Sequence, residues 1–270
     1  MLDVSVSIVL YRSSEEEVVN LLNCFSSNGL SFKISLVDNS PTDRLRVLKL
    51  NENIEYIFNE RNLGFGRAHN IALRKSITEA RYHLVLNPDI YFEPGNLEAM
   101  VKYLDENEDV GQLMPKVLYP SGENQNLCKL LPTPFDLVFR RFLGFLPLAK
   151  RQNRKYELID SGYNKVMNIP YLSGCFMLLR TSVLKEIGFF DERIFMYIED
   201  ADLTRRIHQR YKTVFYPDAT IYHNYAKGSY KNFKLMLYNM HGAIIYFTKW
   251  GWFFDKERVR INKHVLKKYC

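Results

Sequence analysis

Hydrophobic residues in the first 118 positions form short apolar runs, separated by segments with apolar residues three or four positions apart. The runs predict buried strands and the spaced segments predict helices. The expected strands are Val4–Tyr11, Ile34–Val37, Ile54–Phe58, Tyr82–Leu86 and Val110–Leu118; the expected helices are Glu15–Cys24 (entered through Ser13 and Ser14 as caps), Asp43–Leu50, Arg67–Lys75 and Leu97–Leu104. This alternation predicts an α/β fold with a mostly parallel sheet flanked by helices on both faces.

The pattern changes after residue 118. The region Ser121–Pro170 holds Pro132, Pro134 and Pro147 and the basic-aromatic stretch FDLVFRRFLGFLPLAKRQNRK, so we expect an irregular excursion with an amphipathic helix. Residues 171–190 then predict a strand followed by a helix, 199–210 a helix, and 212–223 one or two strands. The last forty residues predict helices in which aromatic and basic residues interleave.

Charge is unevenly distributed along a chain of otherwise ordinary globular composition. The net charge is +7, and positions 227–270 hold ten Lys or Arg against two acids, Asp255 and Glu257. A basic tail suggests an anionic partner such as a membrane surface, a phosphate or a nucleic acid. A solvated helix face explains the charge equally well. The tail aromatics Tyr246, Trp250 and Trp252 suit a membrane interface, or else pack on the rest of the protein.

The four cysteines are widely spaced and form no C-x-x-C pair, so neither a zinc site nor a disulfide framework is indicated. Free thiols fit a reducing compartment. We expect no signal peptide and no transmembrane helix, because strand-like residues begin almost at once and no apolar run reaches 18 residues. A cytoplasmic location is therefore expected.

Polar residues follow three successive predicted strands. They are Asp38–Ser40 after Ile34–Val37, Asn59–Asn62 after Ile54–Phe58, and Asn87–Asp89 after Tyr82–Leu86. In open parallel sheets, ligands bind beyond the carboxyl ends of the strands. Each group alone is typical of a turn, but the three together favour a binding site.

Gly64 and Gly66 precede the helix expected at Arg67–Lys75. They are not a dinucleotide fingerprint, because position 69 holds His69 where a third glycine is needed, and the segment follows the third strand. The glycines permit either a tight turn or a close backbone approach to a ligand.

Three acids, Glu199, Asp200 and Asp202, stand at the start of a predicted helix. Capping alone accounts for acids at such a place. The helix dipole also keeps a carboxylate ionised there, which suits a general base. His223 ends the last predicted strand; imidazole, carboxylate and phosphate oxygens together suit Mn²⁺ or Mg²⁺.

The order of these segments resembles that of the family 2 glycosyltransferases, which have the A-type glycosyltransferase fold. The matching segments are VSVSIVLY, LVDNS, NERNLGFGRAHN, LVLNPD, YLSGCFMLLR, GFFDERIFMYIEDADLTRR and the late His223. The tail AIIYFTKWGWFFDKERVRIN, together with NPD, is similar to the bacterial rhamnosyltransferase branch, which builds surface polysaccharides such as O-antigen.

The resemblance assigns roles to individual positions. Asp38 would hold the nucleobase or ribose end of the donor, and Asn62, Gly64 and Asn70 would line the nucleotide pocket. Asp89 would be the last residue of the family's metal-binding D-x-D, whose first position here is Asn87. Gly174 would lie near the acceptor, Asp200 would be the catalytic base with Glu199 beside it, and His223 would be a further ligand of the metal or diphosphate.

The resemblance also implies a division of the chain. Residues 1–225 would form the catalytic domain, with 1–118 as the nucleotide-sugar half and 119–225 as the acceptor half, and 226–270 would be a helical basic-aromatic extension. The implied reaction is metal-dependent, inverting transfer of L-rhamnose from dTDP-rhamnose to a lipid-linked glycan. The enzyme would then be peripheral on the inner face of the membrane, with Mg²⁺ or Mn²⁺ as cofactor and a sugar nucleotide as donor.

Other functions stay open at this point. The donor could be a UDP-hexose or UDP-galactofuranose, since no residue distinguishes thymidine from uridine. A sugar nucleotidyltransferase would need a glycine-rich phosphate loop after the first strand, where the chain reads YRSSEEE. A non-enzymatic basic membrane-surface protein is supported by the tail. The acidic strand ends argue against that reading and against a nucleic-acid partner.

Overall fold

The computed structural model describes residues 1–25, 29–49, 51–137, 146–224 and 233–270. Residues 138–145, in the stretch expected to contain an amphipathic helix, lie outside this part of the chain. The boundary expected at 225/226 lies outside it as well, so the division into a catalytic domain and an extension stays a prediction.

The described residues form one mixed sheet in the order β3-β2-β1-β4-β10-β6-β11-β5, with β8 paired to β11. The strands β3, β2, β1 and β4 are mutually parallel, as are β6 and β11, whereas β10, β5 and β8 run antiparallel to their neighbours. The bounds are β1 Leu2–Leu10, β2 Phe32–Asp38, β3 Ile54–Phe58, β4 Ala80–Leu86, β5 Ile90–Phe92, β6 Val110–Leu118, β8 Met167–Asn168, β10 Phe176–Arg180 and β11 Lys212–His223. The prediction of a mostly parallel sheet is confirmed.

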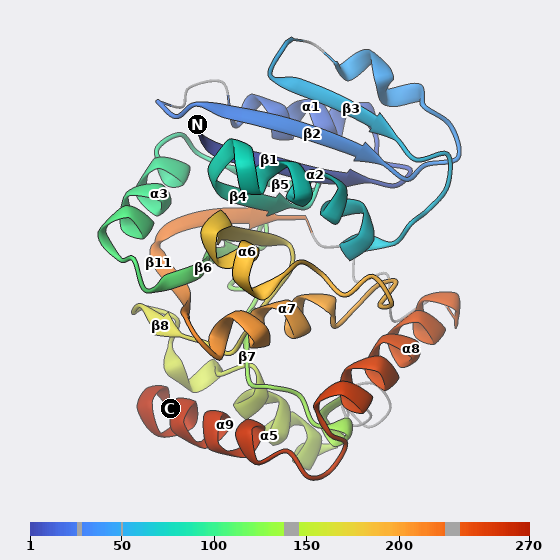
Figure 1. Ribbon diagram of the computed structural model, residues 1–270. Coiled ribbons are helices and arrows are strands. Elements are labelled where there is room, and N and C mark those ends of the chain that lie inside the picture. The colour runs from blue at the N-terminus through green and yellow to red at the C-terminus, as the bar shows by residue number, and fades with distance from the viewer. Residues whose placement is uncertain (26–28, 50, 138–145, 225–232) are drawn as a thin grey trace.

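Helices cover both faces of the sheet (Figure 1). They are α1 Glu15–Asn23, α2 Phe65–Glu79, α3 Asn96–Glu106, α5 Pro147–Tyr156, α6 Thr181–Ile187, α7 Glu199–His208, α8 Phe233–Trp250 and α9 Lys256–Tyr269, with 3-10 turns at Arg44–Leu48 and Ile159–Ser161. Ser14 caps α1 as expected, since its hydroxyl accepts from the Glu17 N–H at 3.1 Å. Because helices lie on both sides, β1 and β4 are buried almost along their whole length.

The helix expected at Asp43–Leu50 is only the short 3-10 turn Arg44–Leu48. Two apolar side chains in this turn, Leu45 and Leu48, are buried, and they are three positions apart. A single turn therefore suffices to bury these two side chains.

The C-terminal helices pack against the rest of the protein, below the sheet in Figure 1 and beside α5 and the small sheet of β7 (Cys128–Lys129) and β9 (Tyr171–Leu172). Arg205 of α7, which is 1% exposed, donates to both carboxylate oxygens of Asp255 at 2.8 and 2.9 Å, and its guanidinium lies 4.1 Å from the Trp250 ring centroid. The interface aromatics expected at Tyr246 and Trp250 are thus part of this packing: Tyr246 is 1% exposed, and the Trp250 indole donates to Asp202.

Three polar side chains are enclosed between β1, β4 and α2. The Ser7 hydroxyl oxygen lies 2.6 Å from His69 Nδ1 and 2.8 Å from His83 Nε2, and none of the three is exposed. Burial lowers the pKa of His83 to about 3, and burial with the neighbouring His83 lowers the pKa of His69 well below 6.5. Burial therefore favours the neutral form of both imidazoles in the folded protein.

The neutral histidines make stability depend on pH. Below pH 6.5 the unfolded chain binds protons at His69 and His83 that the folded protein does not, so this stabilisation is present above pH 6.5 and is lost as the pH falls toward 3. We expect the free energy of unfolding to fall by about 1.4 kcal/mol per pH unit for each histidine. Urea titrations from pH 7 to 5 measure this slope.

A matched pair of variants isolates the histidine contribution. His83→Gln keeps a polar partner for Ser7 but cannot gain a proton, so its slope should be shallower by one histidine's share, whereas His241→Gln, at an exposed position of α8, should keep the wild-type slope. Equal slopes in all three proteins would show that the acid sensitivity arises elsewhere.

Candidate functional site

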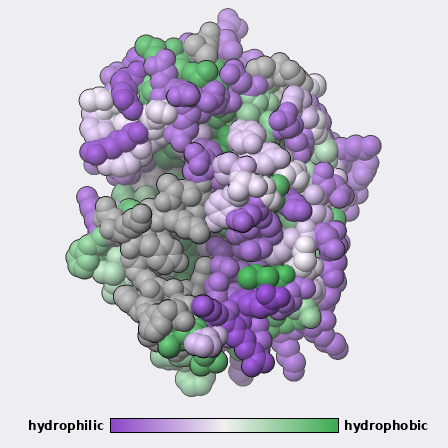
Figure 2. All heavy atoms as spheres, turned by 180° about the vertical axis from the view of Figure 1, so that it is seen from behind, coloured by the Kyte–Doolittle hydropathy of each residue, from purple (hydrophilic) through white to green (hydrophobic). Residues whose placement is uncertain are grey.

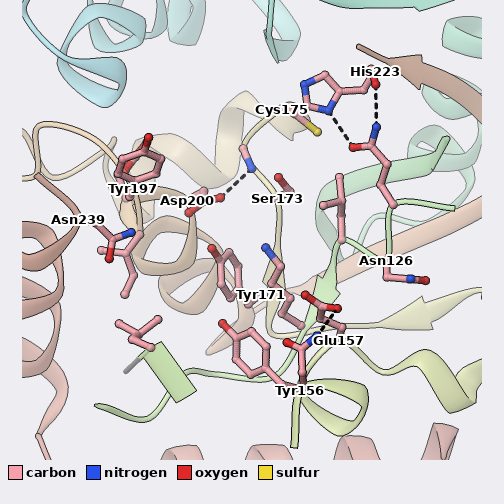
Figure 3. Close-up of a pocket in the computed structure, with 18 of the residues that line it drawn as sticks. Asn126, Tyr156, Glu157, Tyr171, Ser173, Cys175, Tyr197, Asp200, His223 and Asn239 are labelled. Carbon is pink, nitrogen blue, oxygen red and sulfur yellow. Dashed lines mark hydrogen bonds between the residues drawn. The ribbon is translucent and has the colours of Figure 1, made fainter. Parts of the chain in front are cut away.

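A pocket of about 880 Å³ opens between the sheet and helices α5, α7 and α8. Five of the residues expected at a site line it: Asn87, Gly174, Glu199, Asp200 and His223. Figure 3 shows Asp200 at the start of α7 and His223 beyond it, with Ser173 and Cys175 between the two. The carboxylates and the late histidine, which are far apart in the sequence, thus meet at one place.

Asp200 is held by backbone groups on two sides. Its Oδ2 accepts from the Gly174 N–H at 2.9 Å, and its Oδ1 accepts from the Ala201 N–H at 2.8 Å. A Cβ at position 174 would lie 3.1 Å from Asp200 Cβ, so glycine gives the carboxylate room at this point. Tyr171 forms a third hydrogen bond with this carboxylate. Because a carboxylate can accept about four hydrogen bonds, Asp200 can still accept one more.

The electrostatic surroundings separate the two adjacent carboxyl groups. Burial raises the pKa of Asp200, while Lys129, the Gly174 and Ala201 N–H groups and Tyr171 oppose that rise. Burial, followed by the charge of Asp200, raises the pKa of Glu199 well above its usual value. The sequence predicted that the dipole of α7 keeps Asp200 ionised. Burial of the carboxyl group opposes this effect. Lys129, the two N–H groups and Tyr171 act on Asp200, so within the pair they favour the charged form at Asp200 rather than at Glu199.

The backbone just before Glu199 is strained. Tyr197 and Ile198 have φ values of 71° and 66°, in the left-handed region that a β-branched residue such as isoleucine rarely occupies. Each such residue costs about 1–3 kcal/mol and is typical of functional sites. On one side the strained segment meets α8, where a Cβ on Gly242 would lie 2.9 Å from the Tyr197 carbonyl oxygen.

On the other side the same loop meets the start of α2. Phe65 N–H donates to the Phe195 carbonyl at 2.9 Å, and a Cβ on Gly64 would lie 2.2 Å from that oxygen. The sequence predicted either a tight turn or a close backbone approach to a ligand at Gly64, which has a φ of 86°. The structure shows a close backbone approach, but the approaching group is the Phe195 carbonyl of the protein itself. The segment that presents Glu199 and Asp200 is clamped between α2 and α8.

Asp89 and His223 lie together at the ends of β4 and β11. Asp89 Oδ1 is 3.2 Å from His223 Nε2, and His223 Nδ1 is 3.0 Å from Gln125 Oε1. Gln125 also donates to the His223 carbonyl at 2.7 Å, which fixes the residue in place. Burial lowers the pKa of His223, but Cys175 and Asp89 raise it to about 10, so positive charge is favoured at this point.

These two side chains fit a divalent metal ion as a partial ligand set. Within the described ranges, no group of three or more His, Cys, Asp or Glu residues could enclose a metal. A carboxylate oxygen and an imidazole nitrogen in contact suit Mn²⁺ or Mg²⁺ when phosphate oxygens and water complete the coordination. Asn87, at the first position of the motif, adds no carboxylate.

A second group of predicted residues forms at the ends of β2 and β3. Asp38, which is fully buried, accepts from the Ser40 N–H at 2.8 Å and from the Tyr56 hydroxyl at 2.6 Å. Asn62 Oδ1 accepts from the Gly64 N–H at 2.9 Å and from Asn39 Nδ2 at 3.3 Å. Asp38, Asn62 and Gly64 therefore belong to one hydrogen-bonded strand-end region, beside the pocket lining rather than in it.

Asn70 lies apart from the strand-end region and contacts the loop that precedes α7. From α2 it donates to the Phe190 carbonyl at 3.0 Å and to Glu192, and it accepts from the Phe190 N–H at 3.1 Å. Its amide thus holds the loop that leads to Asp200. The nucleotide-binding roles of Asp38, Asn62, Gly64 and Asn70 stay predictions.

Several pocket residues carry no signal in the sequence. Lys129, Tyr156, Tyr171 and Asn239 line the pocket, and Lys129 Nζ lies 5.0 Å from the Tyr171 ring centroid (Figure 3). The first three come from the irregular region 121–170 and the strand just after it, where no periodicity marks an inward face. Their polar and aromatic groups suit a carbohydrate.

Comparison with known proteins defines the class. Residues 5–188 match the family model described as glycosyl transferase family 2, so the chain belongs to this family. With 206 residues aligned, it is 28% identical to the low-salt glycan biosynthesis hexosyltransferase Agl10 of Haloferax volcanii, covering 76% of this chain and 61% of that protein.

Two further relatives are rhamnosyltransferases. The N-acetylglucosaminyl-diphospho-decaprenol L-rhamnosyltransferase of Mycobacterium tuberculosis is 28% identical, with 72% of this chain and 66% of that protein covered. Rhamnosyltransferase WbbL of Escherichia coli is 25% identical, with 74% and 75% covered. The chain thus spans slightly less than two thirds of the length of the Haloferax and mycobacterial proteins.

The fold agrees with the family. The crystal structure of GalNAc-T7 with UDP, GalNAc and Mn²⁺ superposes with a TM-score of 0.63 at 16% identity, over 86% of this chain and 44% of that one. The expected A-type glycosyltransferase fold is confirmed.

Proposed function

We propose that this family 2 glycosyltransferase transfers L-rhamnose from dTDP-rhamnose to a lipid-linked glycan, with inversion at the anomeric carbon. The observation that carries the proposal is Asp200, a charged carboxylate held by two backbone N–H groups at the edge of an 880 Å³ pocket. A single positioned base suffices for one displacement. The rhamnosyl relatives and the decaprenol-linked acceptor in one relative's name support the donor and the acceptor.

Two groups of residues divide the chemistry. Asp200 accepts the proton of the acceptor hydroxyl as that oxygen attacks, while Gly174 and Ala201 keep the carboxylate in a fixed orientation. Asp89, together with the pocket residue His223, would hold a Mg²⁺ or Mn²⁺ ion. When bound, such an ion neutralises charge on the diphosphate leaving group.

The remaining site residues would bind the two substrates. We assign the nucleotide end to the strand-end region of Asp38 and Asn62, and the acceptor to the side of Gly174. Residues 1–118 would then form the nucleotide-sugar half and 119–225 the acceptor half. A lipid-linked acceptor places the enzyme on the cytoplasmic face of the membrane as a peripheral protein.

A donor panel tests the proposal. Purified protein is incubated with dTDP-rhamnose, UDP-hexoses or UDP-galactofuranose and a lipid-linked glycan acceptor, with and without Mg²⁺, and release of nucleoside diphosphate and sugar transfer are measured. We expect metal-dependent turnover that is fastest with dTDP-rhamnose. Preference for a UDP-sugar would assign another transferase activity, and no turnover with any donor would support the non-enzymatic membrane-surface protein.

A further inference from the structure

An apolar stripe runs along the exposed side of α8, next to the exposed polar residues Lys234, His241 and Thr248. Phe233, Leu237, Met240 and Ile244 follow one another at spacings of four, three and four residues, so they form a single stripe, and each is about half exposed or more. The opposite face of the helix is also apolar where it packs inward, with Gly242 and Tyr246 buried. A helix in contact with water on one side normally carries polar residues there.

The apolar stripe continues past the end of the helix. Trp252, Phe253 and Phe254 are 40%, 77% and 97% exposed, and the Trp252 ring centroid lies 5.3 Å from that of Phe247 in the last turns of α8. We call the four stripe residues and these three aromatics the α8 surface. Figure 2 shows hydrophobic atoms at the edge of the molecule on the side of α8 and at its lower end. Contiguous exposed patches of this kind mark interaction sites.

The charges beside the α8 surface are positive. The acids of the C-terminal segment, Asp255 and Glu257, are both ion-paired with the buried Arg205 and so do not offset the surrounding cations. Exposed basic residues lie on helices α9 and α5: Lys256, Arg260, Lys263, Lys267, Lys268, Lys150, Arg151 and Lys155. Arg154 of α5 is ion-paired with Asp160 and is not counted among them. Apolar side chains next to basic ones are the composition that binds an anionic bilayer surface.

The positive charge also distinguishes between two possible partners of the α8 surface, a second copy of the chain and an anionic bilayer. The spacing of the stripe would suit helix pairing with a second copy of the chain. In a two-fold dimer, however, the same basic residues of both copies would face each other, and like charges across an interface are unfavourable. An anionic bilayer instead satisfies both the apolar and the basic residues. Among the described helices, none is long and apolar enough to span that bilayer.

We propose that the α8 surface inserts into the headgroup and upper acyl region of an anionic bilayer and orients the pocket toward the membrane. Asn239, next to Met240 of the stripe, lines the pocket, so the pocket wall and the membrane-facing surface are two sides of one helix. This inference rests on the proposed function in one respect: a lipid-linked acceptor would then reach Asp200 without leaving the bilayer.

Vesicle binding by the full chain, without donor or acceptor, tests the proposal. Vesicles of phosphatidylglycerol and phosphatidylcholine should co-sediment with the wild-type protein, more weakly at high salt, while pure phosphatidylcholine should bind less. The double variant Phe253→Ser/Phe254→Ser removes two side chains that are almost wholly exposed, so the fold should persist. We expect its partitioning to fall by about tenfold or more. Leu237→Gln/Met240→Gln should behave in the same way.

Val47→Ser is the matched control, because Val47 is 66% exposed on the 3-10 turn Arg44–Leu48, outside the α8 surface; it should bind as the wild type does. Unchanged binding in both double variants would overturn the proposal. A second outcome would also overturn it: the wild-type protein binds no vesicles and forms a dimer in sedimentation equilibrium, and both double variants are monomers. The vesicle assay contains no substrate, so its result does not depend on whether the proposed transfer reaction is correct. In a separate assay, transfer to a water-soluble acceptor should be equal in wild type and all variants.

Discussion

Replacing Asp200 with asparagine is expected to slow sugar transfer by on the order of 10²-fold or more and to leave donor binding nearly unchanged. Asparagine has almost the same shape but cannot take the proton of the acceptor hydroxyl. Its amide can accept only one of the two backbone N–H groups that now reach the carboxylate, from Gly174 and Ala201. A loss of stability of about 1–3 kcal/mol is therefore expected as well, and thermal unfolding should accompany the kinetics.

Glu199→Gln is the control for this prediction. The pKa of Glu199 is raised well above its usual value by burial and by Asp200, which favours the neutral form that the amide resembles. We expect transfer within a few-fold of wild type. If Asp200→Asn instead transferred sugar at the wild-type rate and Glu199→Gln did not, the base would be Glu199 and Asp200 would serve only to begin the helix.

Replacing Asp89 with alanine is expected to weaken donor binding itself. Asp89 Oδ1 and His223 Nε2 are 3.2 Å apart, and removal of the carboxylate leaves one protein ligand for the metal. We expect the affinity for dTDP in the presence of Mg²⁺ to fall by roughly 10- to 100-fold or more, since the loss of groups that merely support metal ligands already has effects of this size. Calorimetric titration of dTDP with and without Mg²⁺ measures the change.

The comparison without metal makes the prediction specific. In the absence of Mg²⁺, wild type and Asp89→Ala should bind dTDP with similar affinity, because the carboxylate acts through the ion. Asp43→Ala, at an exposed acid on the 3-10 turn Arg44–Leu48, should match wild type under both conditions. Equal Mg²⁺-dependent binding by wild type and Asp89→Ala would remove Asp89 from the metal site.

The parallel half of the sheet and its strand ends could be predicted from the sequence because buried strands have continuous apolar runs. The strand Ile54–Phe58 has the predicted bounds, and β4 ends at Leu86, directly before Asn87. The segment 212–223 was ambiguous because Pro217 interrupts it; the structure forms one strand, β11, whose pairing with β6 shifts register between Tyr216 and Thr220. A bulge of this kind accommodates the proline.

Other features depend on contacts that no local pattern reveals. The left-handed Tyr197 and Ile198 and the close approach at Gly242 exist only because α8 packs against the loop before α7. The same problem affects the tail. Helix α8 carries apolar residues on its buried side and on part of its exposed side, so periodicity could not distinguish the buried Tyr246 from the exposed Ile244. The acids at the start of α7 are, by contrast, a local feature of the sequence. The role of Asp200 as the base follows from the resemblance to the family and stays a prediction.

The anomeric configuration of the product tests the central claim most directly. The purified protein is supplied with dTDP-rhamnose, Mg²⁺ and the lipid-linked acceptor, and the new glycosidic linkage is assigned by nuclear magnetic resonance. One base at Asp200 and a single displacement predict a configuration opposite to that of the donor, with no product from Asp200→Asn on the same time scale. Retention of the donor configuration would contradict the account, because it requires a second nucleophilic step for which the proposal assigns no residue.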